Sequence, residues 1–126
     1  MSIQKVLYCD DEPDIRKIAR MSLASIGGWS VSLASSGQEA IALAIQVQPD
    51  VILLDVMMPG MDGPATLEQL RENPLTSDIP VVFLTAKVQP HEVESYLKLG
   101  AVGVIAKPFD PITLPDQIRE LIQRGR

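Results

Sequence analysis

The chain has 126 residues, of which 46% are hydrophobic and 4% aromatic, and this size suits a single hydrophobic core and one domain over residues 1–126. Eleven basic residues against 16 acidic ones give a net charge of -5, which disfavours binding to nucleic acid or to anionic membranes through a basic surface. The single cysteine, Cys9, excludes an intrachain disulfide and is expected to be a small buried side chain.

The start of the sequence shows no secretory signal pattern. Residues 1–5 lead into a short apolar segment without the features of a secretory signal, and no segment has the length of a membrane span. We therefore expect a cytoplasmic protein without membrane insertion. Only residues 124–126 follow the last helical pattern, so no output domain is visible, and the sequence leaves open whether the chain is a whole protein or a fragment.

Five short apolar runs have the length of β-strands. Four of them are almost continuously apolar, which is typical of strands buried on both faces, whereas one alternates and predicts an edge strand. The alternating run is 31–34, and the others are 6–9, 51–54, 81–84 and 102–106.

Between and after these runs, apolar residues recur at helical spacing. The first helical segment carries apolar residues from Ile15 to Ile26 and is predicted to end before Gly27. Further segments centre on residues 40–47, 67–70, 93–97 and 118–122. Strict alternation of strand and helix predicts an α/β fold in which five helices cover both faces of a doubly wound, five-stranded parallel sheet.

Polar residues directly follow four of the five runs: Asp10 and Asp11, Asp55, Thr85, and Lys107. In a doubly wound sheet these positions meet at one edge, the edge where such folds bind their ligands. Three carboxylates held close together repel one another, and a bound cation relieves that repulsion. Oxygen-only ligands favour Mg²⁺ over zinc, and Mg²⁺ readily accepts phosphate oxygens, so the pattern indicates phosphoryl chemistry.

Each of these residues also has a purely structural interpretation. Asp10 or Asp11 could cap the first helix, although capping does not account for two adjacent acids. Thr85 could bond to the loop after its strand, and Lys107 could extend from the sheet edge into solvent. Asp55 is the hardest to explain structurally, because a carboxylate that follows four buried residues is costly unless it is paired.

Four segments together resemble the receiver domain of response regulators, most closely the stand-alone form similar to chemotaxis regulators. The similarity runs from about residue 6 to residue 122, and the combination of segments is specific although no single one is. The segments are Tyr8-Cys9-Asp10-Asp11-Glu12, the stretch 55–63 that begins Asp55-Val56-Met57, the pair Thr85-Ala86, and Lys107-Pro108-Phe109.

This resemblance implies a flavodoxin-like strand order, 2-1-3-4-5, and a phosphorylation-dependent signalling switch. Asp55 would accept a phosphoryl group from a phosphohistidine and become an aspartyl phosphate, with Thr85 and Lys107 completing the catalytic set. Mg²⁺ would be held by Asp11, Asp55 and the backbone carbonyl of Met57, and by Asp10 through water. Such a domain is not a true enzyme, because it catalyses only its own phosphorylation and dephosphorylation.

The resemblance also implies how the signal leaves the site. Thr85 would move towards the phosphoryl group and shift a surface made of the fourth helix, the fifth strand and the fifth helix. The chain departs from the family at Val104, where a Tyr or Phe often rotates inward as the threonine moves. Met57 and Lys87 occupy positions that, in the family, flank the path of hydrolytic water.

The implied partners are proteins. No histidine phosphotransfer element is visible, so the donor would be a separate histidine kinase or histidine phosphotransfer protein that docks on the first helix near Arg16 and Arg20. The signal would pass to a downstream effector protein that the sequence does not identify, without direct contact with nucleic acid. A homodimer is an option that the sequence leaves open.

Three other functions compete with this interpretation. The strongest is a degenerate receiver that keeps the fold and acts as a phosphate-independent interaction module, although every site residue is present. A phosphatase of the haloacid-dehalogenase type usually needs a second acid where this chain has Met57. A flavodoxin-like electron carrier needs a phosphate-binding loop after the first strand, where Asp10 and Asp11 would repel a phosphate.

Overall fold

The computed structural model describes residues 2–124, which form a five-stranded parallel sheet in the order β2-β1-β3-β4-β5. The predicted fold class and strand order are therefore confirmed. Each predicted run corresponds to a strand, and the ends agree to within a residue. The strands are β1 Lys5–Cys9, β2 Ser30–Ala34, β3 Val51–Asp55, β4 Val81–Thr85 and β5 Gly103–Ala106.

Helices alternate with the strands, as predicted. The first helical segment is the irregular one, because its last turn, η1, is a π-helix in which the Gly27 amide donates to the Ser22 carbonyl at 3.0 Å. The wider turn lies where the Ser22 hydroxyl donates to the carbonyl of Pro111. The helices are α1 Pro13–Met21, η1 Ser22–Ile26, α2 Gly37–Val47, α3 Gly63–Glu72, α4 Pro90–Lys98 and α5 Leu114–Arg124.

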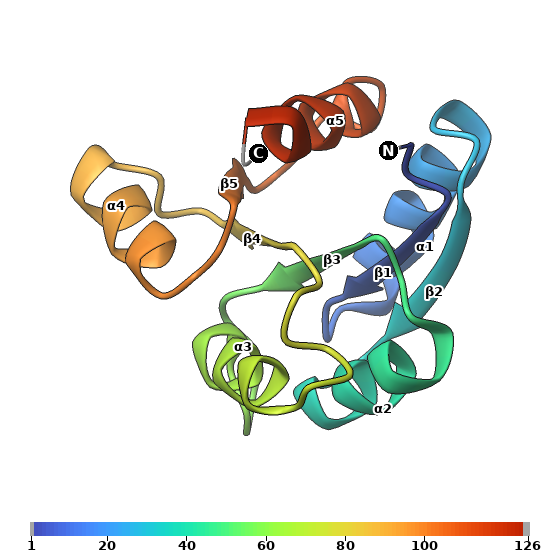
Figure 1. Cartoon of the computed structure of the whole chain (residues 1–126). Coiled ribbons are helices and arrows are strands. Elements are labelled where there is room, and N and C mark those ends of the chain that lie inside the picture. Colours follow the sequence, from blue (N-terminus) through green and yellow to red (C-terminus); the bar gives the residue numbers. More distant parts are fainter. Residues whose placement is uncertain (1, 125–126) are drawn as a thin grey trace.

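The sheet divides the core into two layers (Figure 1). Alternate strand residues such as Leu54 and Phe83 pack against α2 and α3 on one face, and α4 covers the side of β5. The intervening residues, such as Leu53 and Val82, pack against α1 and α5 on the other face. Because β1, β3 and β4 are buried on both faces, they read as continuous apolar runs.

The strand at 31–34 was predicted to be an edge strand, and β2 does form one edge. The apolar character of the run at 102–106 wrongly suggested burial on both faces. β5 forms the other edge, with Val104 partly buried and Ala106 exposed. Helix α4 shields part of this edge, which explains why the strand stays apolar without lying inside the sheet.

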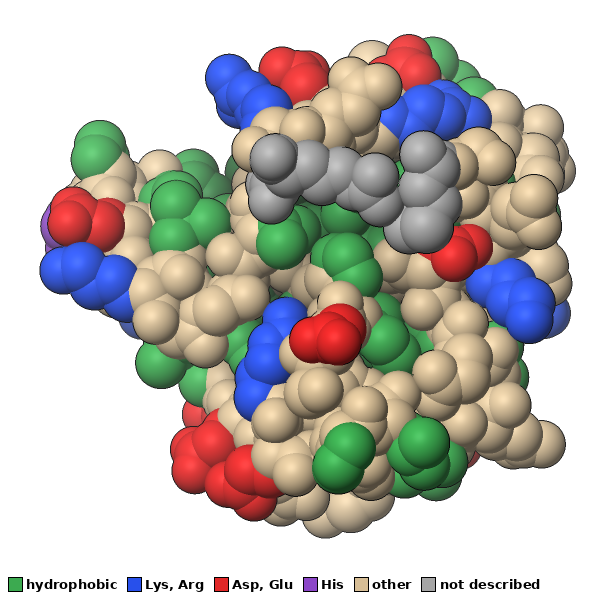
Figure 2. All heavy atoms as spheres, viewed as in Figure 1, with side chains coloured by type: hydrophobic (Ala, Val, Ile, Leu, Met, Phe, Trp, Pro, Cys, Tyr) green, Lys and Arg blue, Asp and Glu red, His purple; other side chains and the backbone are tan. Residues whose placement is uncertain are grey.

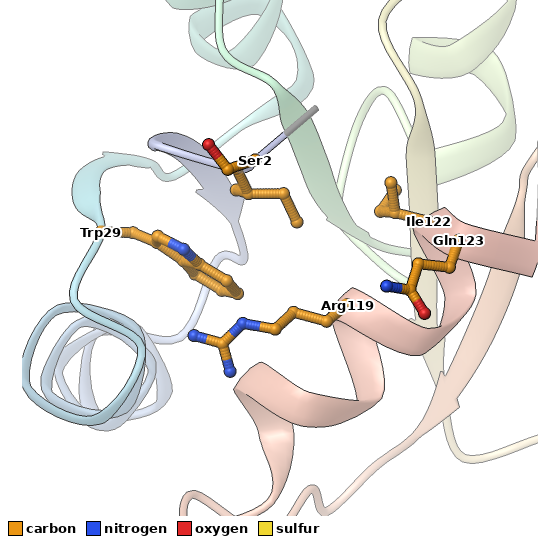
Figure 3. Close-up of a pocket in the computed structure, with 6 residues that line it drawn as sticks. Ser2, Trp29, Arg119, Ile122 and Gln123 are labelled. Atoms are coloured by element: carbon orange, nitrogen blue, oxygen red, sulfur yellow. The ribbon is translucent and has the colours of Figure 1, made fainter.

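At the amino ends of the strands, α5 is tied to the segment before β2. The guanidinium of Arg119 stacks over the Trp29 ring at 4.8 Å and donates to the Gly27 carbonyl at 3.1 Å. Figure 3 shows these two side chains beside a hollow of about 400 Å³ that Ser2, Ile122 and Gln123 also line. This hollow lies at the edge of the sheet opposite to the carboxyl ends of the strands.

The outer surface carries charges of both signs. On the face shown in Figure 2, basic side chains stand apart from one another among acidic and uncharged groups and form no continuous stripe. None of the helices within residues 2–124 is both long and apolar enough to cross a bilayer.

Candidate functional site

Four strand ends place polar side chains at the carboxyl edge of the sheet. Asp10 directly follows β1, Asp55 is the last residue of β3, and Thr85 is the last residue of β4. Lys107 directly follows β5, and its backbone amide donates to the Thr85 carbonyl at 2.9 Å. The structure thus brings the predicted residues together, because neighbouring parallel strands end side by side.

The Asp10 carboxylate is fully buried and is held by three donors. Its Oδ1 accepts from the Glu12 amide at 3.0 Å. Its Oδ2 accepts from the Tyr8 hydroxyl at 3.1 Å and from Lys107 Nζ at 3.0 Å. Arg16 donates to the Asp10 backbone carbonyl at 2.7 Å and fixes the chain at this point. Capping of the first helix is therefore not what Asp10 does in this structure, since α1 has no side-chain cap.

Asp55 is buried as well, with a relative exposure of 3%. Its Oδ2 accepts from Lys107 Nζ at 3.2 Å, and its Oδ1 lies 3.4 Å from the Met57 amide, a long hydrogen bond. Burial and the charge of Asp10 raise the pKa of Asp55 from 3.8 to about 6, against the lowering effect of Lys107. The carboxylate is therefore poorly compensated and would gain from a second positive charge.

Lys107 joins the two buried carboxylates. Its ammonium lies 3.0 Å from Asp10 Oδ2 and 3.2 Å from Asp55 Oδ2, and its side chain is 18% exposed. Burial lowers the pKa of Lys107, but the bonds and charges of the two carboxylates outweigh that effect and raise it overall. The lysine thus keeps its positive charge at the point where an anionic group would meet Asp55. This geometry does not support its solvent-extended interpretation.

One oxygen atom from each of Asp10, Asp11 and Asp55 can be chosen so that all three lie within 4.8 Å of one another. Asp11 is partly exposed, so the cluster opens to solvent on its side. The donor set consists of carboxylate oxygens, which suit a hard divalent cation. These residues can therefore hold a metal ion.

Thr85 lies at the same edge and is buried at 3% exposure. Its hydroxyl accepts a hydrogen bond from the Lys87 amide at 3.0 Å, so in this conformation it also orders the loop before α4. Both interpretations of this residue, a loop anchor and a site residue, remain compatible with its position. Met57 follows Asp55 by two residues, and its side chain is 69% exposed.

Similarity to known proteins identifies the family of this chain. The family described as "Response regulator receiver domain" matches residues 6–119. The chain belongs to the receiver domains of response regulators. It therefore functions in two-component signalling, and the family resemblance predicted from the four sequence segments is confirmed.

The related proteins include longer transcriptional regulators. The receiver is 41% identical over 121 residues to the probable transcriptional regulator ycf27 of Guillardia theta, which covers 96% of this chain and 46% of that protein. It is 37% identical over 120 residues, 95% of this chain, to the DNA-binding dual master transcriptional regulator RpaA of a Synechocystis strain. The chain spans about half the length of the curated relatives it matches, 49% in the case of RpaA.

Among solved structures, the chemotaxis response regulator CheY4 of Vibrio cholerae is similar over 95% of this chain and 99% of that one. Its TM-score is 0.87 at 32% sequence identity. The receiver domain of the Francisella response regulator 1452 gives a TM-score of 0.85 at 30% identity, over 98% of this chain and 99% of that chain. Both agree with the flavodoxin-like strand order of this receiver.

In this receiver, the position of the expected switch aromatic is taken by Val104, which pairs with Phe83 on β4. The Phe83 ring packs edge-to-face against Tyr96 of α4, with ring centroids 5.4 Å apart. An aromatic contact between β4 and α4 thus exists, although it does not come from β5.

Sequence patterns missed two residues of the receiver site. Tyr8 was noted in an apolar run and in the first receiver-like segment, without a role of its own, and Arg16 only as a residue of a docking face. Whether each side chain reaches Asp10 depends on how β1 and α1 are oriented in the fold. The Tyr8 hydroxyl donates to the Asp10 carboxylate. The Arg16 side chain reaches back across the first turn of α1 and donates to the Asp10 carbonyl. A polar atom on a buried strand residue was the available signal for Tyr8.

Proposed function

We propose that this receiver accepts a phosphoryl group on Asp55 from a phosphohistidine, with Mg²⁺ bound at the acidic cluster. The observation that carries the proposal is the buried pair of Asp10 and Asp55, which shares one ammonium group and opens to solvent through Asp11. An ion-pair network used for stability alone gains little from a third acid at the open side. A bound cation would account for the three carboxylates, and an incoming phosphate would account for the ammonium group beside them.

The transfer is an in-line displacement at phosphorus. An oxygen lone pair of Asp55 forms the new O–P bond, the N–P bond of the phosphohistidine breaks, and its electron pair returns to the imidazole ring. Burial holds the Asp55 carboxylate in one orientation, and Lys107 neutralises charge on the phosphoryl oxygens. Thr85 is within the same strand-end layer and is assigned to the phosphoryl group after transfer.

Asp11, Asp55 and the backbone carbonyl of Met57 are the ligands that we assign to Mg²⁺, with Asp10 reaching it through water. When bound, the ion neutralises the carboxylates and the equatorial phosphoryl oxygens. Burial and the Asp10 charge keep the pKa of Asp55 near 6, and a cation at this point favours its ionised, nucleophilic form.

The donor is a histidine kinase or a histidine phosphotransfer protein. A groove of about 330 Å³ beside Lys107 is lined by apolar side chains of α1 and of the segment after β5, including Ile15, Ile18 and Phe109. Such an open apolar groove suits a protein surface better than a small substrate. A partner seated there would bring its phosphohistidine to the carboxyl edge of the sheet.

The output follows from a movement of Thr85 towards the phosphoryl group. Because the Lys87 amide bonds to the Thr85 hydroxyl, that movement would alter the loop before α4 and then the surface formed by α4, β5 and α5. We propose an effector protein as the reader of this surface and no direct contact of this domain with nucleic acid, in line with its net charge of -5. Self-association through the same surface is a further option.

The test is mass-spectrometric detection of phosphorylation by acetyl phosphate, with and without Mg²⁺. The parent protein should gain one phosphoryl group in a Mg²⁺-dependent reaction, and Asp55→Asn should lose at least 90% of it, about a tenfold effect or more. Modification that persists in Asp55→Asn would remove Asp55 from its role.

Asp62→Asn is the matched control, because Asp62 lies in the same loop but caps α3 through the Ala65 amide. It should be phosphorylated like the parent. If the parent takes up no phosphoryl group under any condition, the chain is a phosphate-independent interaction module instead.

A further inference from the structure

The hydroxyl of Tyr8 lies in the acidic site although its ring belongs to the core. The side chain is fully buried, and its ring packs edge-to-face against Phe109 with centroids 6.3 Å apart. The hydroxyl donates to Asp10 Oδ2 at 3.1 Å. A phenylalanine ring would fill the same space, so packing does not account for the hydroxyl.

The three donors around Asp10 differ in how firmly they are held. The Glu12 donor is a backbone amide, and the Tyr8 donor is the hydroxyl of a buried ring; both residues lie two positions from Asp10 in the chain. The Lys107 ammonium stands on a flexible stem and is shared with Asp55. Two donors are therefore fixed, one on each oxygen of the carboxylate, while the third is able to move.

We propose that Tyr8 is a positioning residue that holds Asp10 Oδ2 in place while Lys107 shifts towards the incoming phosphoryl group. The proposal rests on the proposed function. With its hydroxyl present, the Asp10 carboxylate keeps a donor on each oxygen after the ammonium has moved. Without it, Oδ2 depends on Lys107 alone, so the carboxylate rotates more freely and retains the lysine more strongly.

The structure therefore assigns two effects to the hydroxyl. A fixed Asp10 is preorganised for the metal position, and hydrogen bonds to the residues around a metal typically change its affinity by about 10- to 100-fold. A lysine that is less tightly held by Asp10 is freer to neutralise the phosphoryl oxygens. Both effects act through Asp10, so Tyr8 itself need not touch the metal or the phosphate.

The test is Tyr8→Phe, which removes the hydroxyl and keeps the ring. Calorimetric titration of the unphosphorylated protein with MgCl₂ should show a Kd about tenfold higher than that of the parent. At saturating Mg²⁺, the maximal rate of phosphorylation by acetyl phosphate should fall about tenfold, while the half-saturating concentration of the donor stays unchanged.

Tyr96→Phe is the matched control, because it deletes the hydroxyl of the chain's other tyrosine, on α4 and outside the acidic cluster. Its Mg²⁺ affinity should equal that of the parent. Parent-like Mg²⁺ affinity and phosphorylation rate in Tyr8→Phe would overturn the role of Tyr8 alone. A parent protein that binds no Mg²⁺ would overturn the proposed function as well.

A second measurement needs no substitution. In protein labelled with ring-fluorinated tyrosine, the ¹⁹F resonance of Tyr8 should shift when MgCl₂ is added, and that of Tyr96 should not. A Tyr8 resonance that does not respond while the protein binds Mg²⁺ would contradict a link between this hydroxyl and the metal position, even if Tyr8→Phe were too unstable to study.

Discussion

The surroundings of Asp55 disfavour its ionised form. Burial and the carboxylate of Asp10 favour its protonated form, and Lys107 offsets only part of that, so its pKa is raised from 3.8 to about 6. Because the folded state binds this proton more tightly than the unfolded chain does, the charge of Asp55 destabilises the fold above pH 6. That cost shrinks as pH falls through 6 and disappears below about 4.

Asp55→Asn should therefore stabilise the protein in the absence of Mg²⁺ at neutral pH. We expect a gain on the order of 1 kcal/mol in the free energy of unfolding, discounted for the water that reaches the site. The gain should shrink as pH is lowered towards 4, because the parent then carries a protonated Asp55. Urea unfolding in EDTA at several pH values checks this, and a gain independent of pH would contradict the assigned charge effect.

At the scale of the elements, the loop between β3 and α3 fits the sheet with no space left at Gly63. The Gly63 amide donates to the Val56 carbonyl at 2.9 Å. A Cβ added at this residue would lie 2.7 Å from the Asp55 carbonyl oxygen and 2.8 Å from the Val56 Cα. These are backbone atoms, so an added methyl group would move the loop that also carries Met57.

Gly63→Ala should lower the free energy of unfolding by about 1–3 kcal/mol, as overpacking of this kind does. It should also weaken Mg²⁺ binding, because the shifted loop carries the carbonyl assigned to the ion. Chemical denaturation and MgCl₂ titration measure the two effects. Gln69→Ala, at an exposed position of the same helix, serves as the control and should change neither. Unaltered stability in Gly63→Ala would contradict this prediction, because it would mean that the loop moves to accommodate the methyl group without cost.

At the scale of the whole molecule, function and part of the stability lie at opposite edges of the sheet. The acids meet at the carboxyl ends of the strands. At the amino ends, Arg119 of α5 stacks on Trp29 (Figure 3) and donates to the Gly27 carbonyl. The stack and the hydrogen bond each contribute in the range of about 0.5–2 kcal/mol. The pair that Arg119 forms with Asp116 is solvent-exposed and adds little.

Arg119→Ala should reduce the free energy of unfolding by about 1–2 kcal/mol and leave Mg²⁺ affinity and phosphorylation unchanged. Fluorescence of Trp29, the one tryptophan in the sequence, follows the unfolding directly. The control is Arg124→Ala near the end of α5, whose exposed pair with Glu120 at 4.0 Å should be worth less than about 0.5 kcal/mol. A loss of Mg²⁺ affinity in Arg119→Ala would mean that the two edges are coupled.

Most of the architecture could be predicted because it depends on local patterns. Short apolar runs alternate with helical spacing, and together with the right-handed crossover rule this leaves few arrangements for a parallel sheet. The edge position of β5 followed from the family strand order and not from the apolar run itself, because apolar residues such as Val104 are shielded by α4 where a second neighbouring strand would lie. The π-helical turn at 22–26 escaped prediction. The Ser22 hydroxyl in this turn bonds to the carbonyl of Pro111, which is distant in sequence.

The sequence by itself determined that Asp10, Asp11, Asp55, Thr85 and Lys107 come to one edge of the sheet, because each of them ends or follows a strand and parallel strands end side by side. Only the tertiary structure decided that Lys107 is shared by two carboxylates and that Tyr8 turns its hydroxyl into the site. The physical reason is that position along a strand depends on local periodicity, whereas the partner of a buried polar atom depends on packing between segments that are far apart in the chain.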